Sequence, residues 1–151
     1  MTLTSILALV AIAVYLVCTA IKCKEIPDSI SETAYVVDKP EVFTGIIFTE
    51  ACLLLLPLLE HSSENTQWLA FLTIVGLIMV ALTPKYKTEG SIAHYTGGML
   101  AGIASQALIA LNEPTILYTW AAFPILYLIS KEDYTCWAEL ICLINIFTFI
   151  L

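Results

Sequence analysis

Three ionisable side chains lie inside long apolar stretches of the sequence, where a charge is costly. At a helical rise of about 1.5 Å per residue, Glu50 lies about 12 Å, His94 about 5 Å and Glu139 about 8 Å from the polar end of its stretch. Ionisable groups at such depth usually mark functional sites. Two carboxylates and an imidazole can hold the polar group of a ligand. They can equally hydrogen-bond to a neighbouring helix, which contributes about 1 kcal/mol, and the sequence leaves both interpretations open.

The stretch that contains His94 has a regular pattern of small and polar residues. Positions 94, 98, 102 and 106 are His, Gly, Gly and Gln, and residues four apart lie on one side of a helix. A second row with the same spacing consists of small residues: Ala93, Gly97, Ala101 and Ser105. Small side chains let another helix approach closely. We therefore expect this helix to be central, with His94 and Gln106 facing the other helices.

Polar faces of three apolar stretches are predicted to meet at one site that opens to the cytoplasm. In the last stretch Thr135, Glu139 and Cys142 share a helical face, and in the second stretch Glu50 and Pro57 do so. We assign no catalytic and no metal-binding residue. The predicted ligand-binding residues are Glu50, His94, Gln106 and Glu139, together with Ser31 and Glu32 from a polar connection.

These side chains need a scaffold of apolar helices. Hydrophobic residues make up 60% of the 151 residues and charged residues only 13%, which is far from the composition of soluble domains. A membrane-spanning helix needs about 20 apolar residues. We predict one all-α domain, residues 1–151, that forms a transmembrane bundle of about six helices. The predicted spans are 2–21, 42–59, 67–83, 91–111, 115–130 and 134–151.

The lysines orient this bundle. Lys22, Lys24 and Lys39 lie in the first connection, Lys85 and Lys87 in the third, and Lys131 in the fifth. The second and fourth connections contain none. Lysine-rich connections stay on the cytoplasmic side of a membrane. We therefore expect the 22–41 loop to be cytoplasmic, both termini to face outward, and the protein to be a multi-pass protein of the bacterial inner membrane.

Composition also excludes several functions. A net charge of −7 without any arginine gives no basis for nucleic-acid binding. Two histidines, one in an outer connection, cannot supply a histidine-rich zinc site, and the GxSxG, HExxH and P-loop motifs do not occur. We expect no cofactor and lean against an enzyme. The expected partners are membrane lipid and a small or lipid-like ligand, and the sequence leaves a homo-oligomer open.

The 22–41 connection has a pattern of its own. Ser29 or Ser31 is suited to cap a short helix, with Glu32 in its first turn. Alternatively, Ser31 and Glu32 fold back beneath the bundle to meet His94 and Lys85. The sequence does not decide between these two arrangements.

Two segments together resemble a bacterial family of small multi-spanning proteins. One is Ile-Pro-Asp-Ser-Ile-Ser-Glu-Thr-Ala-Tyr at residues 26–35; the other is Ala-Leu-Thr-Pro at 81–84 followed by Ser-Ile-Ala-His at 91–94. That family is distantly similar to the superfamily of alkaline ceramidases and progestin/adiponectin receptors, whose hydrolases hold zinc with an Asp, a Ser and three His. Only His94 and Ser29 or Ser31 can correspond here. The resemblance therefore implies the fold more than the activity.

Three functional hypotheses follow. The leading one is a membrane protein with a polar cavity in the inner half of the bilayer that binds a small or lipid-like ligand. The second is a small transporter built from two three-helix repeats, because Pro57 and Pro124 lie in corresponding spans and interrupted helices mark transporter sites. The third is a membrane-embedded lipid hydrolase.

Overall fold

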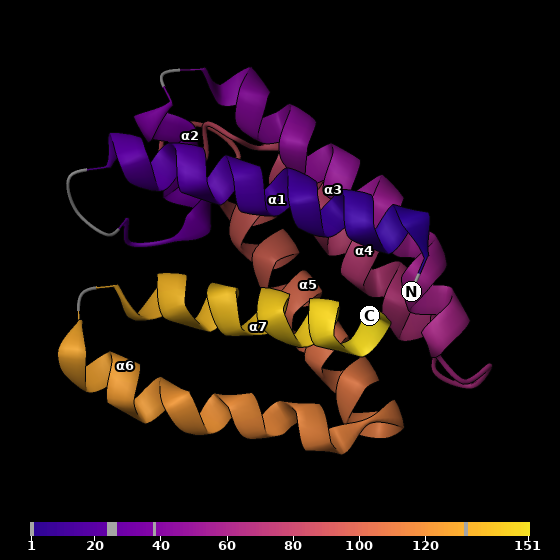
Figure 1. The fold of residues 1–151 in the computed structure, drawn as a ribbon. Helices are drawn as coiled ribbons and strands as arrows, with labels where there is room; N and C mark the ends of the chain where they lie inside the picture. Colours follow the sequence, from indigo (N-terminus) through magenta and orange to yellow (C-terminus); the bar gives the residue numbers. More distant parts are fainter. Residues whose placement is uncertain (1, 24–26, 38, 132) are drawn as a thin grey trace.

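A computed structural model describes residues 2–23, 27–37, 39–131 and 133–151. In these residues every regular element is a helix, and there is no strand (Figure 1). Helices form over each of the six apolar stretches, and no boundary differs from the expected one by more than two residues. Lys24, which was used to orient the chain, lies outside the described residues. The elements are α1 (Leu3–Lys22), η1 (Ile30–Glu32), α2 (Thr33–Val36), α3 (Pro40–His61), α4 (Gln67–Leu82), α5 (Ser91–Asn112), η2 (Pro114–Ala122), α6 (Phe123–Ile129) and α7 (Tyr134–Ile150).

The fifth apolar stretch differs from a regular α-helix. It is a 3-10 helix from Pro114 to Ala122 and becomes α-helical only from Phe123 to Ile129. Pro124 lies in the first turn of α6. A proline lacks the N–H of the helical ladder, and its ring clashes with the carbonyl four residues earlier, so Pro124 disfavours α-helical geometry in the last residues of η2.

Within the described residues, two helices, α1 and α3, are long and apolar enough to cross a membrane. The apolar segments Gln67–Leu82, Pro114–Ile129 and Tyr134–Ile150 are shorter. Helix α5 has 22 residues, but it is less apolar because it contains His94, Gln106 and several glycines.

Helix α5 packs most tightly against α4, at two glycines. A Cβ atom on Gly97 would lie 2.6 Å from Met79 Cβ and 2.8 Å from the carbonyl oxygen of Gly76. A Cβ atom on Gly76 would lie 2.5 Å from the backbone nitrogen of Ala101. The small residues at 97 and 101 therefore allow the close helix contact that the sequence predicts.

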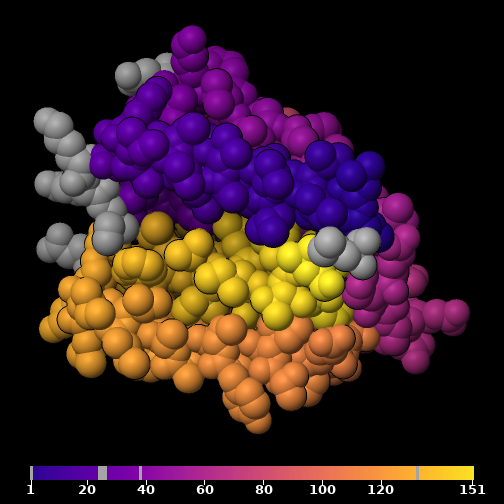
Figure 2. Space-filling view, in the orientation of Figure 1, coloured from indigo at the N-terminus to yellow at the C-terminus, as the bar shows by residue number. Residues whose placement is uncertain are grey.

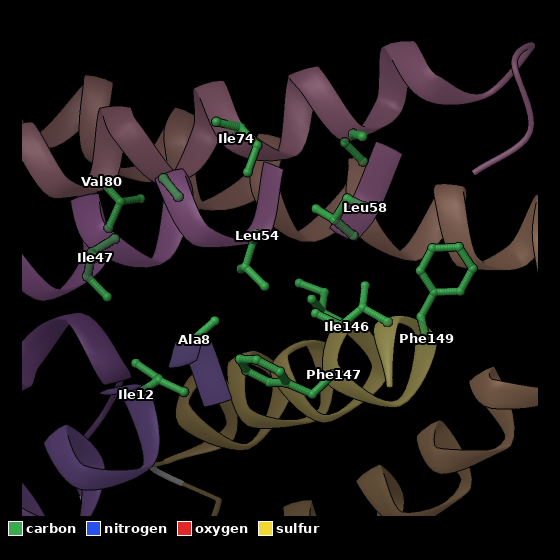
Figure 3. Close-up of a cluster of buried hydrophobic side chains, with 14 of the residues drawn as sticks. Ala8, Ile12, Ile47, Leu54, Leu58, Ile74, Val80, Ile146, Phe147 and Phe149 are labelled. Atoms are coloured by element: carbon green, nitrogen blue, oxygen red, sulfur yellow. The ribbon is translucent and has the colours of Figure 1, made fainter. Parts of the chain in front are cut away.

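The hydrophobic core lies between α1, α3, α4, α5 and α7. Figure 3 shows Ala8 and Ile12 from α1, Leu54 and Leu58 from α3, Ile74 from α4, and Ile146, Phe147 and Phe149 from α7. On the face of the molecule that Figure 2 shows, α7 lies between α1 and the η2–α6 segment.

The connections gather at two opposite ends of the molecule. Both termini and the 62–66 turn lie at one end (Figure 1), where the backbone N–H of Ser63 donates to the side chain of Asn112 at the end of α5. At the other end, segment 27–37 contacts both the 83–90 loop and the start of α7. The described lysines belong to this second end, since they lie in or next to these connections.

Candidate functional site

A cavity of about 350 Å³ extends from the lysine-rich end into the middle of the helix bundle. Helices α3, α5 and α7 supply most of its wall, and η1, α1 and α4 complete it. Among the predicted ligand-binding residues, Ser31, Glu50, His94 and Glu139 line this cavity. The structure thus brings together the three ionisable residues of the apolar stretches.

Glu50 lies on the wall that α3 contributes. Its side chain is buried, with 3% of the residue exposed. Among the described residues, neither of its carboxylate oxygens has a hydrogen-bond partner. Ile47 and Leu54, one helical turn to either side, line the same cavity and are apolar (Figure 3). A buried carboxylate without a partner is costly, and most buried polar groups are paired.

His94 is held in place by the loop before α5. Its Nδ1 lies 3.1 Å from Thr83 Oγ1, and Thr83 in turn donates to the carbonyl of Met79 at 2.7 Å. Because the hydroxyl hydrogen is used there, His94 Nδ1 must be the donor, and Nε2 of the neutral ring is then an acceptor. The Tyr86 ring stacks on the imidazole, with 4.2 Å between ring centroids. This orients the ring along the cavity wall.

Glu139 connects α7 to segment 27–37, which covers the cavity at the lysine-rich end. Its Oε2 accepts the backbone N–H of Ile30 at 2.5 Å, and the N–H of Cys136 donates to the carbonyl of Asp28 at 3.0 Å. Ser29 caps η1, because its hydroxyl accepts the N–H of Glu32 at 3.2 Å. Ser29, Ile30 and Ser31 all line the cavity, so η1 forms its end wall. Of the two predicted arrangements of this segment, the cap by Ser29 is present.

Glu32 is not on the cavity wall. Its carboxylate forms an ion pair with Lys87 and not with Lys85, the partner in one of the two predicted arrangements. Its Oε2 accepts the N–H of Asp28 at 2.9 Å. The hydrogen bond from Lys87 holds the pKa of Glu32 below its usual value. The backbone N–H of Lys87 also donates to Tyr35 Oη at 2.8 Å. Glu32 therefore fastens the cavity's end wall to the neighbouring loop.

Gln106 also lies away from the cavity, in a second polar cluster. Its Oε1 accepts from Trp120 Nε1 at 3.0 Å and from Asn145 Nδ2 at 2.7 Å, and Asn145 Oδ1 accepts from Thr119 at 2.5 Å. This cluster joins α5, η2 and α7. The observed contacts of Gln106 are those of a residue that holds helices together.

Sequence reasoning missed Thr83 and Tyr86, which position His94. Both lie in a short polar loop, and no local pattern distinguishes them from exposed loop residues. Tyr86 is nevertheless buried, and this burial raises the pKa of its hydroxyl. The one signal that could have drawn attention to Tyr86 is an aromatic residue eight positions before a histidine that lies in an apolar stretch.

Within the described ranges, no group of three or more His, Cys, Asp and Glu side chains is placed to hold a metal ion. A catalytic zinc usually takes three protein ligands. Comparison with protein-family models, curated proteins and solved structures finds no match to this chain.

Proposed function

We propose that this chain is a multi-pass membrane protein whose cavity binds a small lipid-like ligand. The observation that carries the proposal is Glu50, a buried carboxylate with no partner in the described part of the chain, set in an apolar cavity wall. A group that costs free energy in the empty protein gains a partner when a ligand with a polar end and an apolar body enters. Small-molecule sites combine an apolar wall with few polar groups and measure about 300–1,000 Å³.

The proposed membrane location rests on the outer surface as well as on α1 and α3. Helix α6 has no buried residue, and Ile125, Leu128 and Ile129 are 62%, 72% and 75% exposed. Exposed apolar side chains in such numbers are costly in water and favourable in lipid. The resemblance to multi-spanning bacterial proteins fits the same proposal.

Six crossings are consistent with the lengths of the helices. A helix of 16 residues, as in α4, extends about 24 Å, slightly less than the bilayer core of about 30 Å, and bilayers adjust to such mismatch. The fifth segment extends further, because its 3-10 residues rise about 2.0 Å each; nine of these and seven α-helical residues span roughly 28 Å. We propose that the lysine-rich end faces the cytoplasm and that both termini face outward, as in a bacterial inner-membrane protein.

The two alternatives have less support. The transporter hypothesis needs interrupted helices in corresponding spans, but α3 continues as an α-helix through Pro57, and only the fifth segment changes its helix type near its proline. The hydrolase hypothesis needs a set of zinc ligands, and within the described residues no three His, Cys, Asp or Glu side chains are placed to hold a metal ion. Neither alternative gains a specific observation.

The proposal can be tested by filling the cavity with a side chain. Gly102 lines it, and a Cβ atom there would meet nothing nearer than Cys142 Sγ at 3.9 Å, so Gly102→Leu should occupy cavity space. Gly45→Leu is the matched control, since a Cβ atom on Gly45 has no neighbour within 4 Å and Gly45 is outside the cavity wall.

The purified full chain, in lipid nanodiscs, is titrated with decanol while the midpoint of thermal unfolding is recorded. A ligand that binds the folded state raises this midpoint. We expect a saturable rise for the wild type and for Gly45→Leu, and little or none for Gly102→Leu. An identical response in all three proteins would show that decanol acts through the lipid and would overturn the proposal.

A further inference from the structure

The cavity contains acids but no base stronger than a histidine. The carboxyl and imidazole groups on its wall belong to Glu50, Glu139 and His94. No lysine is among the described residues of the wall. Lys87, which lies close to the end wall, is paired with Glu32 and its side chain is 48% exposed. Since the sequence has no arginine, the described part of the wall offers no permanent positive charge.

The three ionisable residues differ in their partners. Glu139 already accepts a hydrogen bond from Ile30, and His94 is bonded to Thr83. Glu50 has two acceptor oxygens, both buried and both without a partner within the described ranges. The strongest unmet requirement in the cavity is therefore for hydrogen-bond donors at Glu50.

Different polar groups meet this requirement to different degrees. A fatty acid or a phosphate would bring a further acidic group beside Glu50 and Glu139, and the described part of the wall has no lysine or arginine to offset it. An alcohol donates one hydrogen bond and supplies no charge opposite to that of an ionised carboxylate. An ammonium group donates up to three hydrogen bonds and supplies the opposite charge, and such charge-assisted bonds are about twice as strong as neutral ones.

We infer that the ligand is a lipophilic amine, with its ammonium group bound to the Glu50 carboxylate and its hydrocarbon part along the apolar wall formed by residues such as Ile47 and Leu54. This inference rests on the proposed function, because it assigns the class of ligand to the same cavity. The inference goes beyond the proposed function because it names the charge of the ligand and the residue that selects this ligand.

The test compares three ligands that share one chain and differ in the polar end. Decylamine, decanol and decanoate are each titrated against the purified full chain in nanodiscs of uncharged lipid near neutral pH, with the unfolding midpoint as the signal. The variants are Glu50→Gln and, as a matched control, Glu60→Gln, which changes an exposed glutamate on the same helix outside the cavity wall.

For the wild type we expect decylamine to bind more tightly than decanol, and decanoate to bind least. Glu50→Gln should weaken decylamine binding at least about tenfold, because a charge-assisted hydrogen bond is lost. Decanol binding should weaken less than decylamine binding in Glu50→Gln, since the amide oxygen still accepts the hydroxyl of decanol. A decanol response that persists also shows that the variant is folded. Glu60→Gln should match the wild type for both ligands.

The outcomes separate the inference from the proposed function. Equal binding of amine and alcohol, indifferent to Glu50→Gln, would overturn the amine inference and leave a binding cavity in place. Tightest binding of decanoate would also overturn it. If none of the three ligands gives a saturable response, the proposed function itself fails.

Discussion

The ion pair between Glu32 and Lys87 fastens the end wall of the cavity to the loop between α4 and α5. The hydrogen bond from Lys87 lowers the pKa of Glu32, and the same bond raises the pKa of Lys87. A carboxyl group whose pKa is lower in the folded than in the unfolded chain stabilises the fold above its unfolded pKa. This stabilisation is lost as the pH falls from the ordinary value of 4.5 through the folded pKa.

At the residue scale we therefore predict a pH-dependent effect of Lys87→Met. Near neutral pH this variant should lower the free energy of unfolding by up to about 1 kcal/mol, the usual limit for an exposed ion pair. The difference from the wild type should shrink below about pH 4.5, once Glu32 is protonated. Chemical unfolding in detergent micelles at a series of pH values measures this.

Lys85→Met is the control for this variant, because Lys85 is an exposed lysine of the same loop that does not pair with Glu32. It should change stability little at any pH. A deficit of Lys87→Met that persists undiminished at low pH would contradict an electrostatic role for the pair.

How far the site could be predicted depends on the residue. Glu50, His94 and Glu139 could be found because an ionisable group in an apolar stretch is recognisable from the sequence alone. Gln106 could not be placed from its spacing. Each step of four residues turns a helix by about 40° beyond a full turn, so three steps carry Gln106 roughly 120° around α5 from His94. It therefore faces Trp120 and Asn145 instead of the cavity.

At the scale of elements, the contact between α4 and α5 sets the position of His94. Gly97→Ala places a methyl group 2.6 Å from Met79 Cβ and 2.8 Å from the Gly76 carbonyl oxygen, so the two helices must separate. We predict a loss of about 1–3 kcal/mol in stability, as is usual for overpacking. The free energy of unfolding in micelles is the measurement.

Gly98→Ala is the matched control on the same helix, since its Cβ atom would meet nothing nearer than Val80 Cγ2 at 3.9 Å. It should leave stability unchanged or slightly raised, because alanine favours helix more than glycine does. Equal losses in the two variants would indicate a general effect of glycine replacement and contradict a specific close contact.

The helix boundaries could be predicted closely because apolar stretches and polar connections alternate sharply in this chain. The 3-10 geometry of η2 could not be predicted, because it depends on contacts between distant residues. Thr119 and Trp120 donate to Asn145 and Gln106, which lie on two other helices. Prolines at 114 and 124 indicate only where the α-helix is disfavoured, not which geometry replaces it.

At the scale of the whole molecule, the connections at the two ends differ in charge. The described lysines lie at the end that carries segments 27–37 and 83–90, while the termini and the 62–66 turn lie at the opposite end (Figure 1). If the lysine-rich end is cytoplasmic, a membrane-impermeant maleimide added to intact cells should label Ser63→Cys. It should label Glu89→Cys only after the membrane is opened.

Both substitutions fall on exposed residues and are made in a chain whose five native cysteines are replaced by alanine. Labelling of Glu89→Cys in intact cells would show that the lysine-rich end faces outward and would contradict the proposed orientation. Labelling of neither variant before lysis would contradict a membrane-spanning arrangement.

The most direct test of a ligand cavity inside a membrane-embedded bundle is the reactivity of Glu50 toward dicyclohexylcarbodiimide in native membranes, mapped by mass spectrometry of the digested protein. This lipophilic reagent reaches carboxyl groups in apolar surroundings, where the carboxyl O–H adds across one of its C=N bonds. We predict an adduct on Glu50 whose formation slows when decanol fills the cavity. The ligand cavity would be contradicted if adducts formed only on the exposed Glu60 and Glu64. Labelling of Glu50 that decanol leaves unchanged would contradict it as well.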